Sequence, residues 1–255
     1  MLIATWNVNS LRVRMPHLKD WLAANPVDVI ALQETKLDDP AFPREEVESL
    51  GLKAAFNGQR TYNGVALLAR HELDDVVPGI PGFADEQKRA LAATVGGIRI
   101  IDVYVPNGQA VGSDKYEYKL RWLEALRGYV AAELARHPRL VVLGDYNIAP
   151  EDRDVHDPKA WEGSVHVSEP ERAALRALLA TGLDDCFRRF EQPEKSYSWW
   201  DYRMMAFRRN AGLRIDLVLA SHALARNCGA CHIDKAPRKL DRPSDHAPVV
   251  ASFDI

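Results

Sequence analysis

The sequence has few cysteines and no long apolar run. Its three cysteines among 255 residues are an odd and sparse number, which argues against a disulfide scaffold and for a reducing compartment. No apolar segment approaches the roughly 20 residues that a membrane-spanning helix needs. The first residues lack a basic region and turn polar at Asn7, unlike a signal peptide. We therefore expect a soluble cytoplasmic protein without a membrane partner.

The sequence also lacks a strong net charge. It has 33 Lys and Arg against 36 Asp and Glu, a net charge of -3, so nothing global indicates a polyanionic partner. The charge is uneven, because residues 203–242 contain nine Lys or Arg and three Asp or Glu. Such a basic strip hints at phosphate binding, although an ordinary solvated surface is the simpler explanation at this point.

The composition is that of a globular domain, with 47% hydrophobic and 27% charged residues. No repeat, low-complexity stretch or Gly/Ser linker divides the chain. We therefore predict a single domain over residues 1–255, a length that sandwich folds commonly reach.

Short apolar runs alternate with helical patterns along the whole chain. The predicted strands cover residues 2–6, 27–32, 64–69, 98–105, 140–143, 215–220 and 249–253. Helical spacing of apolar residues predicts helices near 13–24, 115–137 and 169–180, where Ser168 and Glu171 form a capping-box pattern. Strands interleaved with helices predict an α/β fold in which helices cover the sheets.

Polar side chains follow four of the predicted strands. Asn7 follows the first strand and Glu34 the second, Tyr104 lies at the end of the 98–105 run, and Asp145 and Asn147 follow 140–143. Because ligand sites form where strands end at the rim of a sheet, we expect these side chains to form one cluster.

Oxygen-bearing side chains in this set favour a hard cation. Glu34, with Asn7 and Asp245 as additional ligands, suits Mg²⁺ better than Zn²⁺, which prefers His and Cys. His246 follows in a polar turn, where Asp216 could fix its tautomer and leave a cation for a phosphate oxygen. Each residue taken alone is more simply a turn cap or a satisfied buried polar group. Their convergence favours a site.

Longer blocks, spread over the chain, carry a family pattern. They are WNVNSLR at 6–12, DVIALQETK at 28–36, YVPNG at 104–108, GDYNIA at 144–149, SWWDYR at 198–203, NAGLRIDLVLAS at 210–221 and SDH at 244–246. In these blocks and their order, the chain resembles the exonuclease III/apurinic-apyrimidinic endonuclease family of the wider endonuclease/exonuclease/phosphatase superfamily.

The resemblance implies a fold and an activity. The fold would be a deoxyribonuclease-like, four-layered α/β sandwich of two packed mixed β-sheets flanked by helices. The activity would be Mg²⁺-dependent, with Mn²⁺ as a substitute, and would hydrolyse phosphodiester bonds of duplex DNA at abasic sites, nicks or 3′ ends. We also expect a monomer. It does not rank abasic cleavage, 3′-exonuclease and removal of 3′ blocking groups.

The resemblance also assigns metal and water roles by position. Glu34 matches the family's metal-binding glutamate, with Asn7 and Asp245 in the same site. Asp145 and Asn147 match the pair that activates and orients the attacking water, and whether this Asp acts as the base or as the acid for the leaving group stays open.

Three further positions match groups that contact the scissile phosphate. Asp216 and His246 correspond to the family's dyad, and Tyr104 to a tyrosine that does the same. Charge that develops on the phosphate oxygens would be stabilised by protonated His246 and by a hydrogen bond from Tyr104.

DNA contacts are implied as well. Trp199 matches an aromatic residue that packs against the abasic or terminal sugar, with plain core packing as the alternative. The side chains that suit contacts to DNA are Asn107, Arg203, Arg208, Arg209 and Arg214.

His166 departs from the family pattern. Endonucleolytic members usually place a small residue followed by an aromatic one where His166 and Val167 stand, and we expect this loop beside the DNA. An imidazole there would obstruct DNA that continues past the lesion, so 3′-end processing would outweigh internal abasic cleavage. The alternative is that His166 points into solvent.

Other interpretations compete with this one. A phosphatase or phosphodiesterase acting on phosphoinositides would share the metal and histidine chemistry, and a catalytically silent DNA-binding module would share the basic strip. The pattern Cys228-x-x-Cys231-His232 is that of haem attachment. Haem attachment needs export, which the first residues do not indicate, and a zinc site would need a second CxxC, which the sequence lacks.

Overall fold

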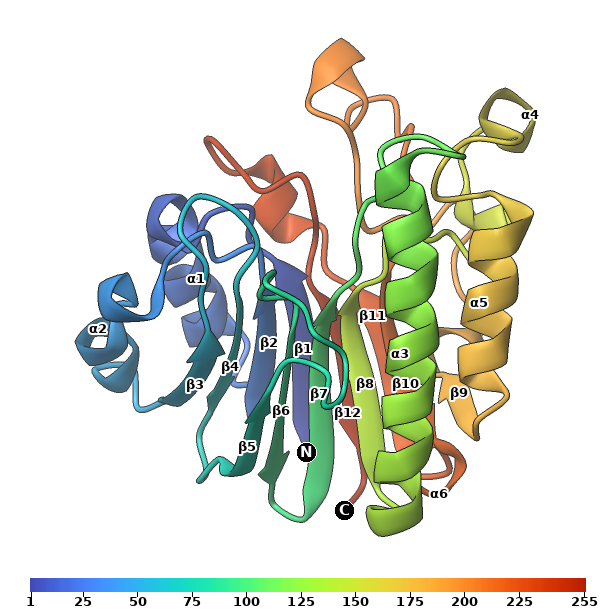
Figure 1. Cartoon of the computed structure of the whole chain (residues 1–255). Coiled ribbons are helices and arrows are strands. Elements are labelled where there is room, and N and C mark those ends of the chain that lie inside the picture. The colour runs from blue at the N-terminus through green and yellow to red at the C-terminus, as the bar shows by residue number, and fades with distance from the viewer.

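Two six-stranded β-sheets form the centre of the computed structural model, which describes residues 1–255 (Figure 1). The first sheet contains, in spatial order, β11 (Cys228–Ile233), β12 (Val249–Phe253), β1 (Leu2–Asn7), β2 (Val29–Gln33), β4 (Val65–Ala69) and β3 (Lys53–Asn57). The second contains β5 (Asp74–Pro78), β6 (Ala90–Val95), β7 (Ile98–Tyr104), β8 (Leu140–Asp145), β10 (Asp216–Ser221) and β9 (Leu183–Asp185). Both sheets are mixed, because β1–β2 and β7–β8 are parallel and the other pairs are antiparallel.

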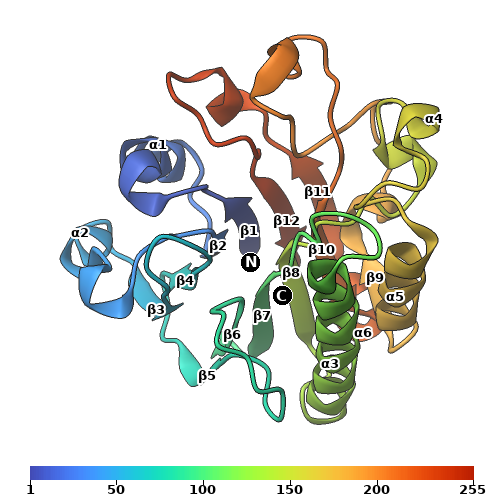
Figure 2. The same ribbon diagram turned by 45° about the horizontal axis from the view of Figure 1, so that its top comes forward.

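Helices cover the outer face of each sheet (Figure 2). The α-helices are α1 (Leu11–Ala24), α2 (Arg44–Glu48), α3 (Asp114–Arg136), α4 (Pro158–Trp161), α5 (Glu169–Leu179) and α6 (His222–Ala225). The 3₁₀ turns are η1 (Asp39–Ala41), η2 (Asp152–Asp154), η3 (Cys186–Arg189), η4 (Arg203–Met205) and η5 (Ala236–Lys239). Helices α1 and α2 lie outside the first sheet, and α3 and α5 lie outside the second.

Three apolar clusters hold the layers together. A cluster of 25 residues, which includes Ile3 and Val141, lies between the two sheets. One of 20 residues joins the second sheet to α3 and α5 through Trp122 and Leu175, and one of 18 residues joins the first sheet to α1 through Leu18. Strands covered on both faces need continuous apolar runs, as in β4 and β8. The predicted four-layered α/β sandwich is confirmed.

All seven predicted strands and all three predicted helices are present. The capping box of Ser168 and Glu171 also forms at the start of α5. The unpredicted strands are β3, β5, β6, β9 and β11. Their sequences are short or contain much Ala, Gly and Asp, which have low strand propensity, so pairing with neighbouring strands determines their conformation.

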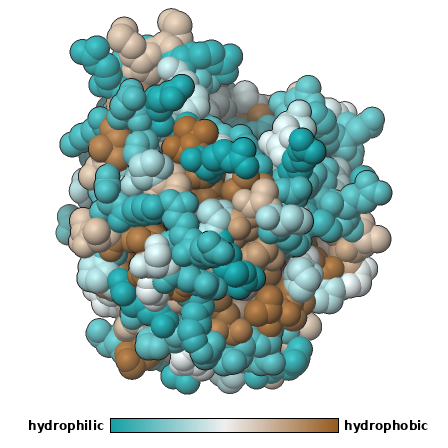
Figure 3. All heavy atoms as spheres, turned by 90° about the vertical axis from the view of Figure 1, so that its left-hand side faces the viewer, coloured by the Kyte–Doolittle hydropathy of each residue, from teal (hydrophilic) through white to brown (hydrophobic).

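The face over α1 and α2 is mainly hydrophilic, and its apolar side chains gather only in small patches (Figure 3). The apolar side of α1 is turned inward, where Leu11, Leu18 and Leu22 are buried. No helix in the chain combines the length and apolar character that crossing a membrane requires.

Candidate active site

The strand topology brings the predicted polar residues to one edge of the two sheets. Asn7 ends β1 and Glu34 follows its parallel neighbour β2, while Tyr104 and Asp145 end the parallel pair β7 and β8. The antiparallel strand β10 begins at Asp216, directly opposite Asp145. The predicted convergence therefore results from strand direction and register.

Two carboxylates and one imidazole form a compact group at this edge. Ligand atoms of Glu34, Asp145 and His246 lie within 4.8 Å of one another. Asn7 links the carboxylates, because its Nδ2 donates to Glu34 Oε1 at 2.9 Å and to Asp145 Oδ2 at 2.9 Å. The Oδ1 atom of Asn7 accepts from the backbone amide of Asn9. In this arrangement Asn7 orients the two carboxylates with its amide donor.

His246 and Asp216 form a buried ion pair. Nδ1 of His246 lies 2.9 Å from Asp216 Oδ2, and Nε2 lies 3.6 Å from Asp145 Oδ2. Burial alone would lower the pKa of His246, but the carboxylates of Asp216 and Asp145 raise it to about 10. The imidazole is thus a fixed cation at neutral pH.

Asp145 can exchange a proton near neutral pH. Burial raises its pKa most, the His246 cation opposes this, and Asp216 raises it again, with a result of about 7. The backbone amide of Asn147 donates to Asp145 Oδ1 at 2.9 Å and fixes the carboxylate plane. A carboxyl group tuned in this way suits general acid–base chemistry.

Tyr104 is a protonated donor beside the carboxylates. Burial raises the pKa of its phenol well above the ordinary value, and the charge of Glu34 raises it further. The guanidinium of Arg89 lies 4.6 Å from the Tyr104 ring centroid and donates to the Tyr104 carbonyl at 3.2 Å. Arg89 therefore contacts Tyr104 at both the face of its ring and its backbone carbonyl.

Asn107, Asn147 and His166 form a wall next to Asp145. Asn147 Nδ2 donates to the Val105 carbonyl at 2.9 Å, and its Oδ1 accepts from Asn107 Nδ2 at 3.3 Å. Asn147 and His166 both adopt left-handed backbone conformations, with φ of 50° and 77°. Such φ values are uncommon for residues other than glycine, although Asn and His adopt them more readily than most, and surrounding contacts help to maintain them here.

His166 is a buried member of this wall. Its side chain packs near Trp161 and Trp199, with ring centroids 6.2 and 6.5 Å away. Burial lowers its pKa to about 3, so the ring is neutral. Nδ1 lies 2.6 Å from the Asn147 carbonyl and so carries the proton, which leaves Nε2 to accept from Asn107. The alternative that His166 points into solvent is wrong, because the residue is 7% exposed.

Asp245 lies beside the compact group rather than within it. Its Oδ1 accepts from Asn9 Nδ2 at 2.9 Å, and its Oδ2 accepts from Trp199 Nε1 at 3.0 Å. Each oxygen accepts one hydrogen bond and keeps a lone pair with which Asp245 could also bind a cation. The same contact holds the half-buried Trp199 ring at the edge of the site.

Three of the predicted DNA contacts are exposed on one projecting loop. Arg203, Arg208 and Arg209 belong to the segment 202–210 at the top of Figure 1, with the exposed side chains of Met204 and Met205 between them. The chain thus presents cations and apolar groups together on the side of the molecule that carries the site.

Arg214 is a correction to the predicted DNA contacts. It is 1% exposed, and its guanidinium pairs with Asp154 at 2.6 Å and Asp185 at 2.8 Å. Arg238 is also buried, with its guanidinium 4.8 Å from the Phe207 ring centroid. The basic strip is therefore only partly a surface, because two of its cations stabilise the interior.

Two serines that sequence reasoning missed support the dyad. Ser198 Oγ accepts from the backbone amides of residues 215 and 216 at 3.1 and 3.0 Å, where β10 begins. Ser244 Oγ donates to the Asn7 carbonyl at 2.6 Å and accepts from the His246 amide at 3.2 Å. Their place inside the blocks at 198–203 and 244–246 is the one signal that could have found them.

Lys36 was also missed. Its Nζ lies 3.0 Å from Glu34 Oε2 and donates to Asn9 Oδ1. This ammonium group partly neutralises Glu34 at the edge of the site. The signal was again position, since Lys36 ends the block at 28–36.

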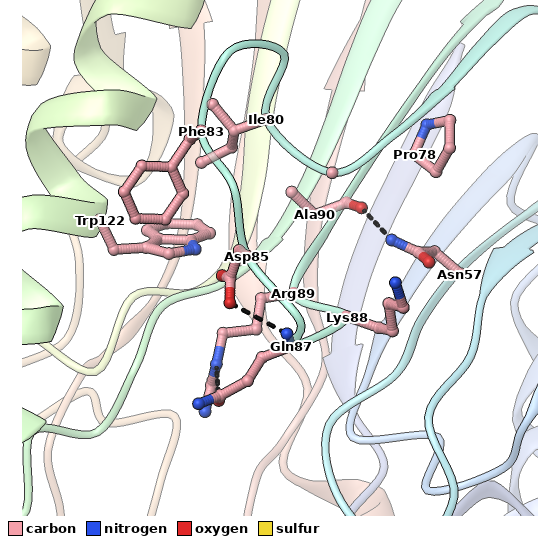
Figure 4. Close-up of a pocket in the computed structure, with 11 residues that line it drawn as sticks. Asn57, Pro78, Ile80, Phe83, Asp85, Gln87, Lys88, Arg89, Ala90 and Trp122 are labelled. Carbon is pink, nitrogen blue, oxygen red and sulfur yellow. Dashed lines mark hydrogen bonds between the residues drawn. The ribbon is translucent and has the colours of Figure 1, made fainter.

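A cavity of about 220 Å³ lies on the far side of Arg89 (Figure 4). It is formed by the loop that precedes β6, by Asn57 and by Trp122 of α3. Figure 4 shows Asp85 accepting from the Gln87 amide, and Gln87 in turn accepts from Arg89 Nε at 2.8 Å. This cavity contains none of the predicted site residues, and one of its lining residues, Arg89, contacts Tyr104 of the site.

The three cysteines belong to the core. Cys186, Cys228 and Cys231 are free, buried and part of the cluster between the sheets. Neither cysteine of the CxxC pattern lies in the group of potential metal ligands.

Comparison with known proteins gives a consistent result. The model of the endonuclease/exonuclease/phosphatase family matches residues 4–246. Exodeoxyribonuclease III of Haemophilus influenzae is 35% identical over 266 residues, which cover 99% of this chain and all of that protein.

Solved structures show the same similarity. The 3′ phosphatase NExo from Neisseria, bound to a product DNA hairpin, is 46% identical with a TM-score of 0.98, and the alignment covers both chains fully. An AP endonuclease from Archaeoglobus fulgidus is 38% identical with a TM-score of 0.96, also over the full length of both chains.

Proposed function

The chain belongs to the endonuclease/exonuclease/phosphatase family and, within it, to the exonuclease III and AP endonuclease group, and from this premise we propose that it processes blocked 3′ ends of duplex DNA in preference to internal abasic sites. It is a DNA-repair nuclease that hydrolyses phosphodiester bonds. The neutral, buried His166 beside Asn147 and Trp199 is the observation that carries the preference. The phosphoinositide alternative is not favoured, since the similar proteins are DNA enzymes.

The group is metal-dependent, and we propose Mg²⁺ as the ion, with Mn²⁺ as a substitute. The donor set fits a hard cation, because Glu34 presents carboxylate oxygens that the Asn7 amide group orients. His246 is assigned to the phosphate rather than to the ion, because its Nδ1 is paired with Asp216. Asp245 and the Asn7 oxygen are the further oxygen donors nearby. When bound, the ion would supply Lewis-acid stabilisation of charge on the phosphate.

The proposed mechanism follows from the protonation states. Asp145, with a pKa of about 7, takes a proton from a water molecule that Asn147 orients. His246 stays charged because Asp216 holds it, and it stabilises the phosphate oxygens as negative charge develops. The Tyr104 phenol donates one further hydrogen bond to that phosphate. No covalent enzyme intermediate is required.

The preference for 3′ ends follows from space and charge. DNA with an internal abasic site must continue past the cleaved bond, whereas a 3′ end with a small blocking group stops there. His166 occupies the position of a small residue between Asn147, Trp161 and Trp199, and it offers no charge to attract a second phosphate. We therefore assign to Trp199 a contact with the terminal sugar.

The substitution His166→Ser tests this preference. It removes the ring while leaving Asp145, Asn147 and His246 unchanged, so cleavage of an internal abasic duplex should rise by at least about tenfold relative to removal of a 3′-phosphate at a nick. An unchanged ratio of the two rates would contradict the proposed role of His166.

The activity itself is tested with three duplexes, which carry an internal abasic site, a recessed 3′ end and a 3′-phosphate nick. We expect all activity to require a divalent ion, to vanish with EDTA and to return with Mg²⁺ or Mn²⁺. Glu34→Ala should lower it by about 10² or more. Full activity of Glu34→Ala would remove the enzyme assignment at this site.

The remaining parts of the proposal concern the whole chain. We propose that residues 1–255 act as one domain and as a monomer, on DNA and not at a membrane. We also propose a cytoplasmic location, because all three cysteines are free thiols. Sedimentation with and without a nicked duplex tests the oligomeric state.

A further inference from the structure

Behind the wall of Asn107, Asn147 and His166 lies a fully buried ion pair. Lys119 of α3 and Glu171 of α5 both have 0% side-chain exposure, and their charged atoms are 2.5 Å apart. Taking two charges out of water is costly, and a well-packed apolar pair often gives equal or greater stability. The pair therefore calls for an explanation beyond stability.

Every hydrogen-bonding position of the ammonium group is used. Lys119 Nζ donates to Glu171, to the Asn147 carbonyl at 2.7 Å and to the Asn107 carbonyl at 3.1 Å. These two carbonyls belong to the segments that follow β8 and β7. One side chain thus fixes both segments that carry site residues out of the second sheet.

Glu171 does the same for the segment before α5. Its Oε1 accepts from the His166 amide at 3.0 Å, and its Oε2 accepts from the Ser168 amide at 3.2 Å and the Ser168 hydroxyl at 2.5 Å. The capping box that the sequence predicted is therefore also a clamp on His166, and through Lys119 it is joined to Asn147.

Two of the clamped residues have uncommon backbone conformations. Asn147 and His166 both have left-handed φ values, which persist only where surrounding contacts impose them. The Asn147 carbonyl accepts from Lys119 and from His166, and the His166 amide donates to Glu171. We propose that the Lys119–Glu171 pair is a positioning element, which sets the orientation of Asn147 for the attacking water and holds His166 in its obstructing position.

This inference rests on the proposed function and adds Lys119 and Glu171 to the residues that determine its specificity. The chain also offers a matched control. Arg99 and Glu133 form a second buried ion pair between the second sheet and α3, with 3% exposure each and a separation of 2.5 Å. Arg99 lies near the start of β7, whereas Tyr104 at the site lies at its end. Loss of this control pair should cost stability without moving the site.

The experiment compares Glu171→Gln with Glu133→Gln, assayed with Mg²⁺ well below their melting temperatures. For Glu171→Gln we expect kcat on the 3′-phosphate nick to fall about 10- to 100-fold with little change in KM. We also expect the ratio of internal abasic cleavage to 3′-phosphate removal to rise several-fold. Glu133→Gln should lower Tm, while its kcat and its ratio of internal abasic cleavage to 3′-phosphate removal should keep their wild-type values.

A lone charge left in the core opposes folding, so the neutral double variant Lys119→Met with Glu171→Gln is prepared in parallel. It removes both charges and should show the same fall in kcat and the same rise in the ratio. If the variants at Glu171 keep the wild-type kcat and ratio, or change them no more than Glu133→Gln does, the positioning role is wrong. Inactivity of the wild type on all three duplexes would instead overturn the proposed function.

Discussion

Two histidines in the site have opposite protonation states, and their neighbours explain the difference. His246 is buried next to the carboxylates of Asp216 and Asp145, which raise its pKa to about 10. His166 is buried among aromatic rings and amide groups without a carboxylate beside its ring, and burial lowers its pKa to about 3. The same residue type therefore supplies a cation at one position and a neutral ring at the other.

The pKa of His166 predicts a pH dependence of folding. In the unfolded chain, His166 takes up a proton near the ordinary pKa of 6.5, whereas in the folded chain it does so only near 3. Its contribution to stability is thus complete above about pH 6.5 and is lost as the pH falls toward 3. Between about pH 8 and about pH 5, the Tm of His166→Ser should fall less than the Tm of the wild type. Equal losses would contradict a buried neutral ring.

The proposed mechanism needs a proton transfer to Asp145. Asp145→Asn keeps the shape of the side chain but cannot take up the proton, so the rate of 3′-phosphate removal should fall by about 10² to 10⁴. Binding of the same nicked duplex, measured by fluorescence anisotropy, should stay within about threefold of wild type. A comparable loss of binding would point to a structural role instead.

At the scale of elements, the site depends on the close approach of β7 and β8. Gly144 has a φ of 147°, and a Cβ atom built on it would lie 1.9 Å from the Val103 carbonyl oxygen. Only glycine allows the two parallel strands to lie this close, immediately before Asp145. Register between Tyr104 and Asp145 follows from this approach.

Gly144→Ala should therefore be strongly destabilising, by about 2 kcal/mol or more, since two backbones must move apart. The control is Gly128→Ala in α3, where a Cβ meets nothing within 4 Å and alanine should stabilise the helix by about 0.5–1 kcal/mol. Urea unfolding of both variants provides the measurement. Gly144→Ala with wild-type stability would show that the strands tolerate a side chain there.

At the scale of the whole molecule, the near-neutral net charge conceals a separation of charge. The projecting loop exposes Arg203, Arg208 and Arg209, whereas Arg214 and Arg238 are buried. Carboxylates such as Glu34 and Asp145 lie inside the site. A net charge of -3 is therefore compatible with a DNA-binding face of modest size.

This separation predicts a modest salt dependence of DNA binding. Replacing Arg208 and Arg209 by Ala should reduce the slope of log Kd against log salt by about one unit per arginine. Arg226→Ala, an exposed arginine just after α6, should leave the slope unchanged. A slope that is flat in the wild type would contradict binding through exposed cations.

Sequence patterns predicted the strands that are continuous apolar runs, and the polar residues that follow them. They could not show pairing, so β6 and β11, rich in small residues, were missed. The buried state of Arg214 was also missed, because its partners Asp154 and Asp185 are far away along the chain. Lys119 was open to prediction, since Tyr116 and Leu123 place it on the buried side of α3. Its contacts to three separate segments appear only in the folded chain.

The central claim is that a neutral, clamped His166 directs a metal-dependent DNA nuclease toward 3′ ends. The most direct test is the ratio of initial rates on a 3′-phosphate nick and on an internal abasic duplex, measured with Mg²⁺ for the wild type and His166→Ser. We expect the wild type to favour the 3′-phosphate by at least about tenfold and His166→Ser to remove most of this preference. A wild type that cuts both duplexes at similar rates would contradict the account.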